Sequence, residues 1–143
     1  MMMNLVYGLV TMGLCLFLQS LLLVVVIRYY SSHQYLLQRQ TFMSSLILVN
    51  GVMVILFSGN LAQIAVWAWL FQLLGEFDHF VEAYYHSAVN FATLGYGDIV
   101  MSEKHRLLGP IEAVNGVLMI GVSTAALLSV FQNILKERKV IAQ

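Results

Sequence analysis

Three stretches of the chain carry no charged side chain, and apolar residues fill most of each. These stretches are residues 1–27, 40–75 and 113–135. About 20 apolar residues in an α-helix are enough to cross the hydrocarbon core of a bilayer, because each residue adds 1.5 Å. We therefore predict three membrane-spanning helices, since an open chain in lipid satisfies its backbone hydrogen bonds only as a helix. The predicted spans are roughly residues 5–27, 42–73 and 108–135.

Composition supports a membrane protein. Hydrophobic residues make up 60% of the 143 residues and charged residues 10%, whereas soluble domains average about 45–50% and about 25%. A small soluble domain has too little interior to bury so much apolar surface, and a disordered chain would carry more charge. The 7 basic and 7 acidic side chains leave no basic surface for nucleic acid. The single cysteine, Cys15, excludes an internal disulfide and a cysteine-based zinc site.

The basic residues predict the orientation, because Lys and Arg collect in cytoplasmic loops. Placing residues 29–41 and the C-terminus in the cytoplasm puts five basic residues inside and two outside; the inverse arrangement reverses these numbers. We therefore expect a multi-pass protein of the plasma membrane with an external N-terminus and residues 75–107 outside. The five are Arg28, Arg39, Lys136, Arg138 and Lys139, and the two are Lys104 and Arg106.

The residues flanking the spans lead to three further expectations. The first span is a retained anchor, because no basic residue precedes it and no small-residue cleavage site follows it. Trp67 and Trp69 lie near the outer end of the second span, either at the membrane interface or simply facing lipid. Three basic residues of the tail either contact anionic lipid or serve only as a juxtamembrane anchor: Lys136, Arg138 and Lys139.

The segment between the second and third spans contains a short apolar stretch. Residues 80–92 are mostly apolar but too few to span, which is typical of a re-entrant helix. Asp78 is its expected N-cap, and Glu82 lies in its first turn. The sequence Thr-Leu-Gly-Tyr-Gly-Asp follows directly at residues 93–98.

Two glycines alternate with ordinary residues in this hexapeptide. Gly95 and Gly97 permit a positive φ, which most side chains resist. Such alternation turns successive carbonyl groups toward one side, where their oxygens can replace the water around a cation. One chain supplies a single wall of such a site, so several copies must surround an axis. Asp98 would then stand at the outer mouth and concentrate cations.

With these residues the sequence resembles the potassium channel family, whose selectivity filters carry the same signature. A weaker resemblance links Gly116, Gly121 and Thr124 to the pore-lining inner helix of bacterial two-helix potassium channels. The resemblance covers roughly residues 42–131 and leaves the first span without an assigned role. It implies a homotetramer that passes K⁺ passively, with no cofactor and no enzymatic reaction. The expected filter residues are Thr93, Leu94, Gly95, Tyr96 and Gly97, with K⁺ at the carbonyl oxygens of Thr93, Leu94, Gly95 and Tyr96.

The resemblance also implies roles for residues around the filter. Tyr96 would brace the filter against the pore helix, and Tyr85 would hydrogen-bond Asp98 from behind. His86 is a candidate filter support, for which simple packing is the alternative. Glu112 is expected to hydrogen-bond the pore helix.

In the third span, Gly116 is either the gating hinge or a helix-packing residue, and Gly121 permits close helix approach. Thr124, Leu128 and Gln132 share one helical face, which would line the cavity, with Leu128 as a candidate constriction.

Three residues depart from the family pattern. Leu94 stands where Val or Ile is usual, Ala92 replaces a threonine, and Val89 stands where some relatives carry a carboxylate. These departures keep open a weakly selective cation channel on the same scaffold. A non-conducting membrane subunit is kept open as well.

Histidines outside the filter each allow two interpretations. His79 and His105 are candidates for a response to external pH, or are ordinary solvated side chains. His79, Glu82 and His86 share a helical face, where packing of the pore helix is preferred over a zinc site.

The predicted organisation is an all-α membrane protein with three transmembrane helices, a re-entrant pore helix and a filter loop. The first helix covers residues 1–28, a cytoplasmic linker 29–41, the pore domain 42–135 and a short cytoplasmic tail 136–143. Within the pore domain we expect an outer helix at 42–74, a pore helix at 79–92, a filter at 93–98 and an inner helix at 108–135.

Overall fold

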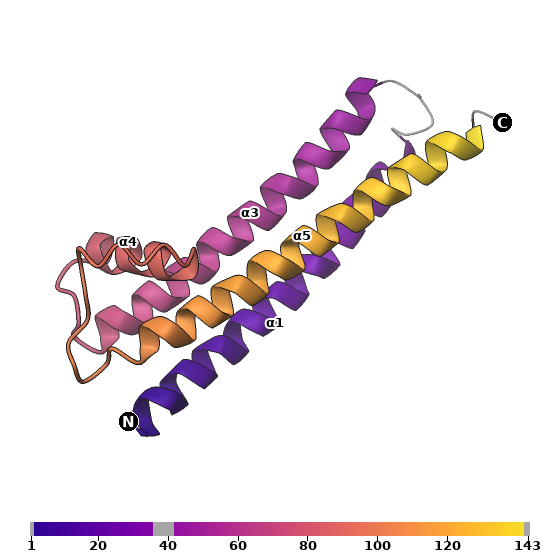
Figure 1. Cartoon of the computed structure of the whole chain (residues 1–143). Coiled ribbons are helices and arrows are strands. Elements are labelled where there is room, and N and C mark those ends of the chain that lie inside the picture. The colour runs from indigo at the N-terminus through magenta and orange to yellow at the C-terminus, as the bar shows by residue number, and fades with distance from the viewer. Residues whose placement is uncertain (1, 36–41, 142–143) are drawn as a thin grey trace.

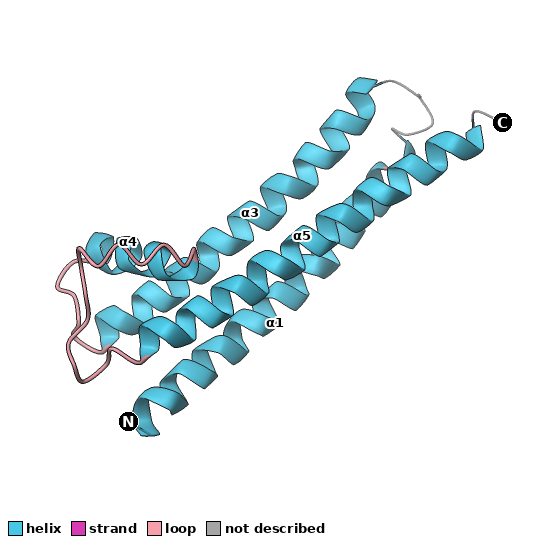
Figure 2. Ribbon diagram, viewed as in Figure 1, coloured by secondary structure: helices cyan, strands magenta, loops and turns pink. Residues whose placement is uncertain are grey.

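The computed structural model describes residues 2–35 and 42–141, and the side chains of the latter range up to Glu137. Three long helices and one short helix make up most of this part of the chain (Figures 1 and 2). They are α1 (Met2–His33), α3 (Phe42–Leu73), α4 (Phe80–Phe91) and α5 (Leu108–Ile141). All 3 long helices are long and apolar enough to cross a membrane. The predicted all-α membrane fold is confirmed.

The three long helices run side by side, and α4 lies against α3 at one end of the bundle (Figure 1). The N-terminus lies at the end that carries α4 and the loop after it, and the C-terminus lies at the opposite end. We call these the α4 end and the C-terminal end. As the basic residues predict, the N-terminus and the loop after α4 lie at one end and the C-terminus lies at the other. Which end faces the cytoplasm remains a prediction.

Two helices extend beyond the limits expected from the sequence. α1 continues past Arg28 to His33, and α5 continues past Leu135 to Ile141. Tyr30 explains part of the extension of α1, because its side chain is buried against the C-terminal end of α5. Residues 36–41 of the linker, Arg39 among them, and the side chains of Arg138 and Lys139 lie outside the described part of the structure.

Buried apolar side chains form a cluster at each end of the bundle. The cluster at the α4 end joins all four helices around Trp67, Phe71 and Phe91. The cluster at the C-terminal end joins only the long helices and includes Val26, Leu48, Val52, Val130 and Ile134. Both expectations for Trp67 were therefore wrong, since it is fully buried, whereas Trp69 is 65% exposed.

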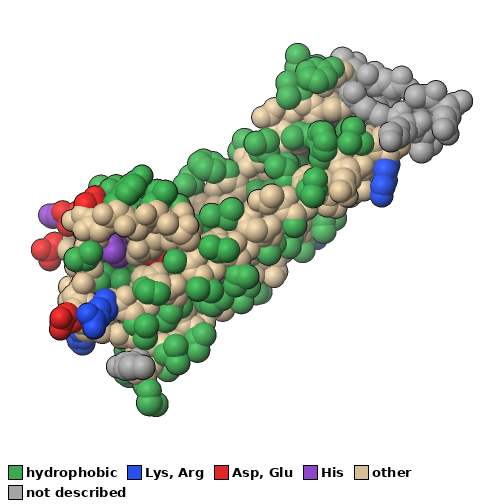
Figure 3. Space-filling model, in the orientation of Figure 1, with side chains coloured by type: hydrophobic (Ala, Val, Ile, Leu, Met, Phe, Trp, Pro, Cys, Tyr) green, Lys and Arg blue, Asp and Glu red, His purple; other side chains and the backbone are tan. Residues whose placement is uncertain are grey.

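The surface of the bundle shows where charge is concentrated. In Figure 3, acidic, basic and histidine side chains gather at the α4 end, and an apolar belt separates them from a basic side chain toward the opposite end. Such a belt is what the hydrocarbon core of a bilayer requires.

Candidate functional site

The C-terminus of α4 passes directly into the 93–98 segment. The Thr93 backbone N–H donates to Asn90 O at 2.9 Å, and the Leu94 N–H donates to Val89 O at 2.9 Å. Thr93 has a φ of 58°. This pair of bonds with a left-handed residue is the Schellman motif that ends many helices, usually with glycine in the left-handed position. Thr93 therefore ends the pore helix and begins the loop in one strained residue.

At its N-terminus, α4 differs from the prediction. The N-cap is His79 rather than Asp78, and no side chain caps the helix. Glu82 lies in the first turn, as expected, where it interacts favourably with the helix dipole.

Left-handed backbone recurs at every second position of the loop. Thr93, Gly95 and Gly97 have φ values of 58°, 59° and 72°. No atom lies within 4 Å of the place that a Cβ would take on either glycine. These glycines therefore serve the backbone conformation, as the sequence predicts, and are not needed for close packing.

The loop runs back along α4 and is covered on one side only (Figure 1). Every residue from 93 to 98 is exposed, and Tyr96 is 65% exposed. Most of the Tyr96 ring is therefore uncovered within one chain, and its expected role as a brace of the filter stays a prediction.

Asp98 at the end of the loop is held by α4. The Tyr85 hydroxyl donates to Asp98 Oδ2 at 2.6 Å, which is the predicted contact. The Ile99 backbone N–H donates to Oδ1 at 3.0 Å. The hydrogen bond from Tyr85 lowers the pKa of Asp98 below its ordinary value, so the carboxylate stays ionised at neutral pH.

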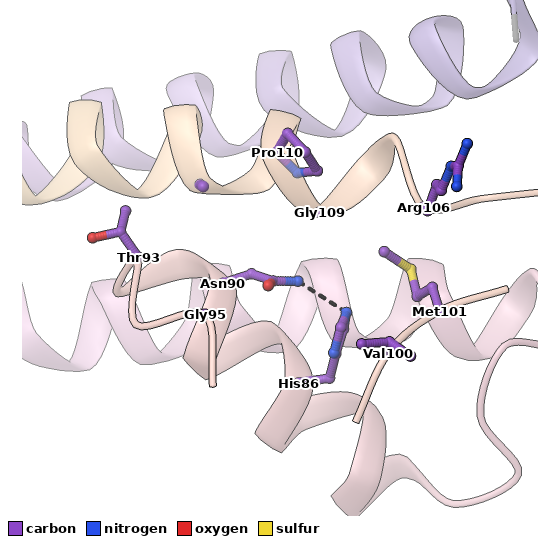
Figure 4. Close-up of a pocket in the computed structure, with 10 residues that line it drawn as sticks. His86, Asn90, Thr93, Gly95, Val100, Met101, Arg106, Gly109 and Pro110 are labelled. Atoms are coloured by element: carbon purple, nitrogen blue, oxygen red, sulfur yellow. Dashed lines mark hydrogen bonds between the residues drawn. The ribbon is translucent and has the colours of Figure 1, made fainter. Parts of the chain in front are cut away.

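His86 links α4 to the chain that follows Asp98. Its Nδ1 lies 2.9 Å from Ile99 O, and its Nε2 lies 2.9 Å from Asn90 Nδ2. A carbonyl oxygen only accepts, so Nδ1 carries the proton and Nε2 accepts from the Asn90 amide. Phe71 and Phe77 pack against the imidazole ring. His86 is therefore both a packing residue and a hydrogen-bonded support. Figure 4 shows its bond to Asn90 beside the loop.

Glu76 forms a clamp that the sequence did not reveal. Its carboxylate accepts from the Ser102 backbone N–H and hydroxyl, each at 2.6 Å, and lies 2.5 Å from His105 Nδ1. Burial opposes ionisation, but the bonds from Ser102 and His105 outweigh it and lower the pKa of Glu76. No spacing pattern links these residues, because the fold alone brings together the ends of α3 and α5.

Burial separates the two histidines that were candidates for a pH response. His105 is 4% exposed in the clamp and is not a solvated surface residue. His79 is exposed. Among the residues that the structure describes, no group of three His, Cys, Asp or Glu side chains is placed to hold a metal ion.

Glu112 joins α5 to the pore helix, as predicted. The Ser87 hydroxyl lies 2.8 Å from Ile64 O and also within hydrogen-bonding distance of the Glu112 carboxyl group. A hydroxyl has one proton and a carbonyl only accepts, so both bonds form at once when the Glu112 carboxyl group is protonated and donates. Asn115, one turn further along α5, is fully buried, and its amide has no partner in the described structure.

Gly116 and Gly121 of α5 differ in their surroundings. A Cβ on Gly116 would lie 2.0 Å from Phe91 O, so Gly116 allows α5 to touch the end of α4. Nothing lies within 4 Å of the corresponding position at Gly121, which therefore makes no close approach within one chain. Thr124, Leu128 and Gln132 are all exposed on one face.

Two open grooves flank the loop. The first, about 370 Å³, lies between α4 and α5 and is drawn in Figure 4. The second, about 380 Å³, lies between Thr93 and the apolar face of α5. Thr93 lines both grooves, and so does Ala113 of α5, so open space lies between the start of the loop and α5.

Comparisons with known proteins place this arrangement in a family. No curated protein and no solved structure matches the chain significantly. Residues 59–133, more than half of the chain, match the ion channel family. The match includes the second half of α3, all of α4, the loop after it and most of α5, and it leaves α1 outside. The chain therefore belongs to the ion channel family, and it is a multi-pass membrane protein and not an enzyme.

Proposed function

We propose that the chain forms a homotetrameric channel that passes K⁺ passively and selectively across the plasma membrane. The observation that carries this proposal is the alternating left-handed backbone at Thr93, Gly95 and Gly97 within the Thr-Leu-Gly-Tyr-Gly-Asp segment. Four such segments form the carbonyl rings of potassium filters. The carbonyl groups of Thr93, Leu94, Gly95 and Tyr96 would coordinate K⁺, and Gly97 would complete the segment.

The exposure of the loop supports assembly around an axis. Irregular backbone at membrane depth is tolerated only where protein buries it or water reaches it. Residues 93–98 are exposed in the single chain, and Thr93 lines two open grooves. Neighbouring copies around a water-filled axis satisfy both conditions, and they also supply cover for the exposed Tyr96 ring.

The charge arrangement supports cation entry from the α4 end. Asp98 lies at the end of the loop and is held in its ionised form by Tyr85. One carboxylate from each copy at the outer mouth raises the local cation concentration. The distribution of basic residues supports an orientation with this end outside the cell and the C-terminal end in the cytoplasm.

A weakly selective cation channel is the second candidate. Leu94 lacks the χ1 stiffness of a β-branched residue and is 55% exposed, so its own chain does not hold it. Val89 supplies no carboxylate behind the filter. Tyr85 and His86 brace the end of the loop instead, because they hydrogen-bond Asp98 and Ile99, the two residues that follow Gly97.

Reversal potentials of the purified protein in bilayers test this proposal directly. Under opposed K⁺ and Na⁺ gradients, a potential near the K⁺ value supports selectivity. A potential near zero favours the second candidate. K⁺ uptake by a transport-deficient host that expresses the chain alone would rule out the hypothesis that the chain is a non-conducting subunit.

Gly95→Ala and Gly97→Ala test the filter assignment. Each places a side chain at a positive φ, which costs roughly 1–2 kcal/mol of strain, without a steric clash. We expect assembly to persist and K⁺ flux to be lost. Gly75→Ala is the matched control, because Gly75 has a φ of 74°, equally open surroundings and a position outside the loop. Undiminished flux in both filter variants would show that this segment is not the conduction path.

A further inference from the structure

Three polar side chains from the three long helices meet inside the bundle. Gln63 of α3 donates its amide N–H to Gln19 Oε1 at 2.7 Å, and Gln19 of α1 donates to Ser123 Oγ at 3.0 Å. Their exposed fractions are 0% for Gln63, 3% for Gln19 and 7% for Ser123. We call these three residues the amide triad. Gln19 is its central member, because it bonds both other residues.

The triad is costly to place in a membrane unless all its members are bonded. Apolar lipid offers no replacement partner for an amide, so buried polar groups in membrane helices bond one another. Without Gln19, Gln63 would lose its acceptor, and Ser123 would keep only a contact to Asn60 Oδ1 at 3.5 Å. The triad therefore ties α1 specifically to α3 and α5.

Two glycines on α3 show independently that α1 packs at a defined position on α3. A Cβ on Gly59 would lie 2.1 Å from Leu22 Cδ1, and one on Gly51 would lie 2.0 Å from the Tyr29 hydroxyl. Both α1 side chains thus occupy space that only glycine leaves on α3. Small residues at helix contacts allow this close packing in membranes.

The position of Ser123 on α5 gives the triad its importance. The first turns of α5 are attached to α4, through Glu112 to Ser87 and through Gly116 to Phe91. Ser123 lies beyond these attachments. From there on, the buried residues Val130 and Ile134 pack in the apolar cluster of the long helices.

A second polar contact between α1 and α5 lies near the C-terminal end. Tyr30 and Glu137 approach to 3.5 Å between hydroxyl and carboxylate oxygens. Any movement of this part of α5 relative to α3 must therefore break the Gln19–Ser123 bond or carry α1 with it.

We propose that α1 is a regulatory helix of the channel and that Gln19 is the latch through which it acts. The latch stabilises the position of α5 beyond Gly116 and so sets the balance between conducting and non-conducting states. This function belongs to the part of the chain outside the matched channel region, and its conduction readout rests on the proposed function. Gln19 acts through Ser123 and does not touch the ion path.

Single-channel open probability tests the latch. Hydrogen bonds between membrane helices average about 0.6 kcal/mol and reach about 1.7 kcal/mol. Gln19→Leu and Ser123→Ala should each shift the ratio of open to closed states, calculated from the open probability, by about 3- to 20-fold in the same direction. The double variant should show no larger shift than the stronger single variant, because both remove the same bond. Unchanged open probability, or fully additive shifts, would overturn the proposal.

Two substitutions of exposed polar residues serve as matched controls. Ser20→Ala and Asn50→Leu remove side chains that bond only their own helix, at Leu16 O and Leu46 O. We expect both to leave open probability unchanged. A latch role is also rejected if these controls shift it as far as Gln19→Leu does, because any loss of polarity would then suffice.

Amide hydrogen exchange in nanodiscs separates this inference from the proposed function. Gln19→Leu should accelerate exchange in α5 from residue 123 to residue 134, while exchange in residues 108–116 stays unchanged. This result is expected whether or not the chain conducts K⁺. Equal protection of the two parts of α5 in Gln19→Leu and wild type would refute the latch even in a conducting channel.

Discussion

The two ends of the bundle are held together in different ways. At the α4 end, specific polar and backbone contacts add to the apolar cluster. The Glu112–Ser87 bond joins α5 to α4, the Glu76 clamp joins the segments that follow α3 and precede α5, and Gly116 touches the backbone of Phe91. At the C-terminal end, apolar side chains supply most of the contact, including Leu48, Val52, Val130 and Ile134. Directional contacts fix distances, as a coordination site for an ion requires. Apolar packing is non-directional and tolerates movement.

The largest effect should come from breaking the α4 end at Gly116. Gly116→Ala forces a Cβ into the backbone of Phe91, which cannot rotate away. We expect a loss of about 3 kcal/mol or more in stability and loss of flux, measured by thermal unfolding and liposome assay. Gly51→Ala at the C-terminal end should cost clearly less, because the group displaced there is the mobile end of the Tyr29 side chain. Equal losses would contradict the comparison.

Glu112 should rank second. Glu112→Leu removes the bond between α5 and Ser87 and should cost about 1–3 kcal/mol. Glu112→Gln keeps a donor for the Ser87 oxygen, so its cost should stay under about 1 kcal/mol. Thermal unfolding of both variants measures the difference. If Glu112→Gln is as damaging as Glu112→Leu, the carboxyl group acts as a charge and not as a hydrogen-bond donor.

The Glu76 clamp should respond to acid. Its pKa in the folded protein lies below the ordinary value of 4.5, so its stabilisation is complete above that value. It is lost as the pH falls through the lowered pKa. Amide exchange in residues 102–105 should therefore rise only below about pH 4.5. In Glu76→Gln this acid-dependent step should be absent, and its persistence would assign the step to another group.

Tyr85→Phe should have the smallest effect. The ring keeps its packing, but Asp98 loses the hydroxyl donor that lowers its pKa. We expect external acid to reduce current at a higher pH in the variant than in wild type, since protonation removes the charge at the mouth. Current–pH profiles measure this shift. Tyr84→Phe is the control, because the Tyr84 hydroxyl bonds Leu61 O and not Asp98. A shift toward lower pH would contradict the role of Tyr85.

Much of the site could be predicted because its residues are neighbours along the chain. The re-entrant helix and the glycines follow from local composition, and the Tyr85–Asp98 bond follows from one helix and the loop after it. The Glu76 clamp and the burial of His105 could not be predicted, because their partners lie far apart in sequence. The surroundings of Trp67 were misjudged for the same reason, since α1 covers it with residues such as Cys15.

The sequence by itself determined the class of protein and the number of spans and supplied the proposed cation-binding motif, since each depends on hydropathy or on backbone freedom over a short stretch. Only the tertiary structure decided what α1 contacts, because an apolar helix in lipid has many possible faces and no hydrophobic force selects one. The close contacts at Gly51 and Gly59 and the hydrogen bonds of the amide triad select the face that α1 uses, and both can be seen only once the helices are packed.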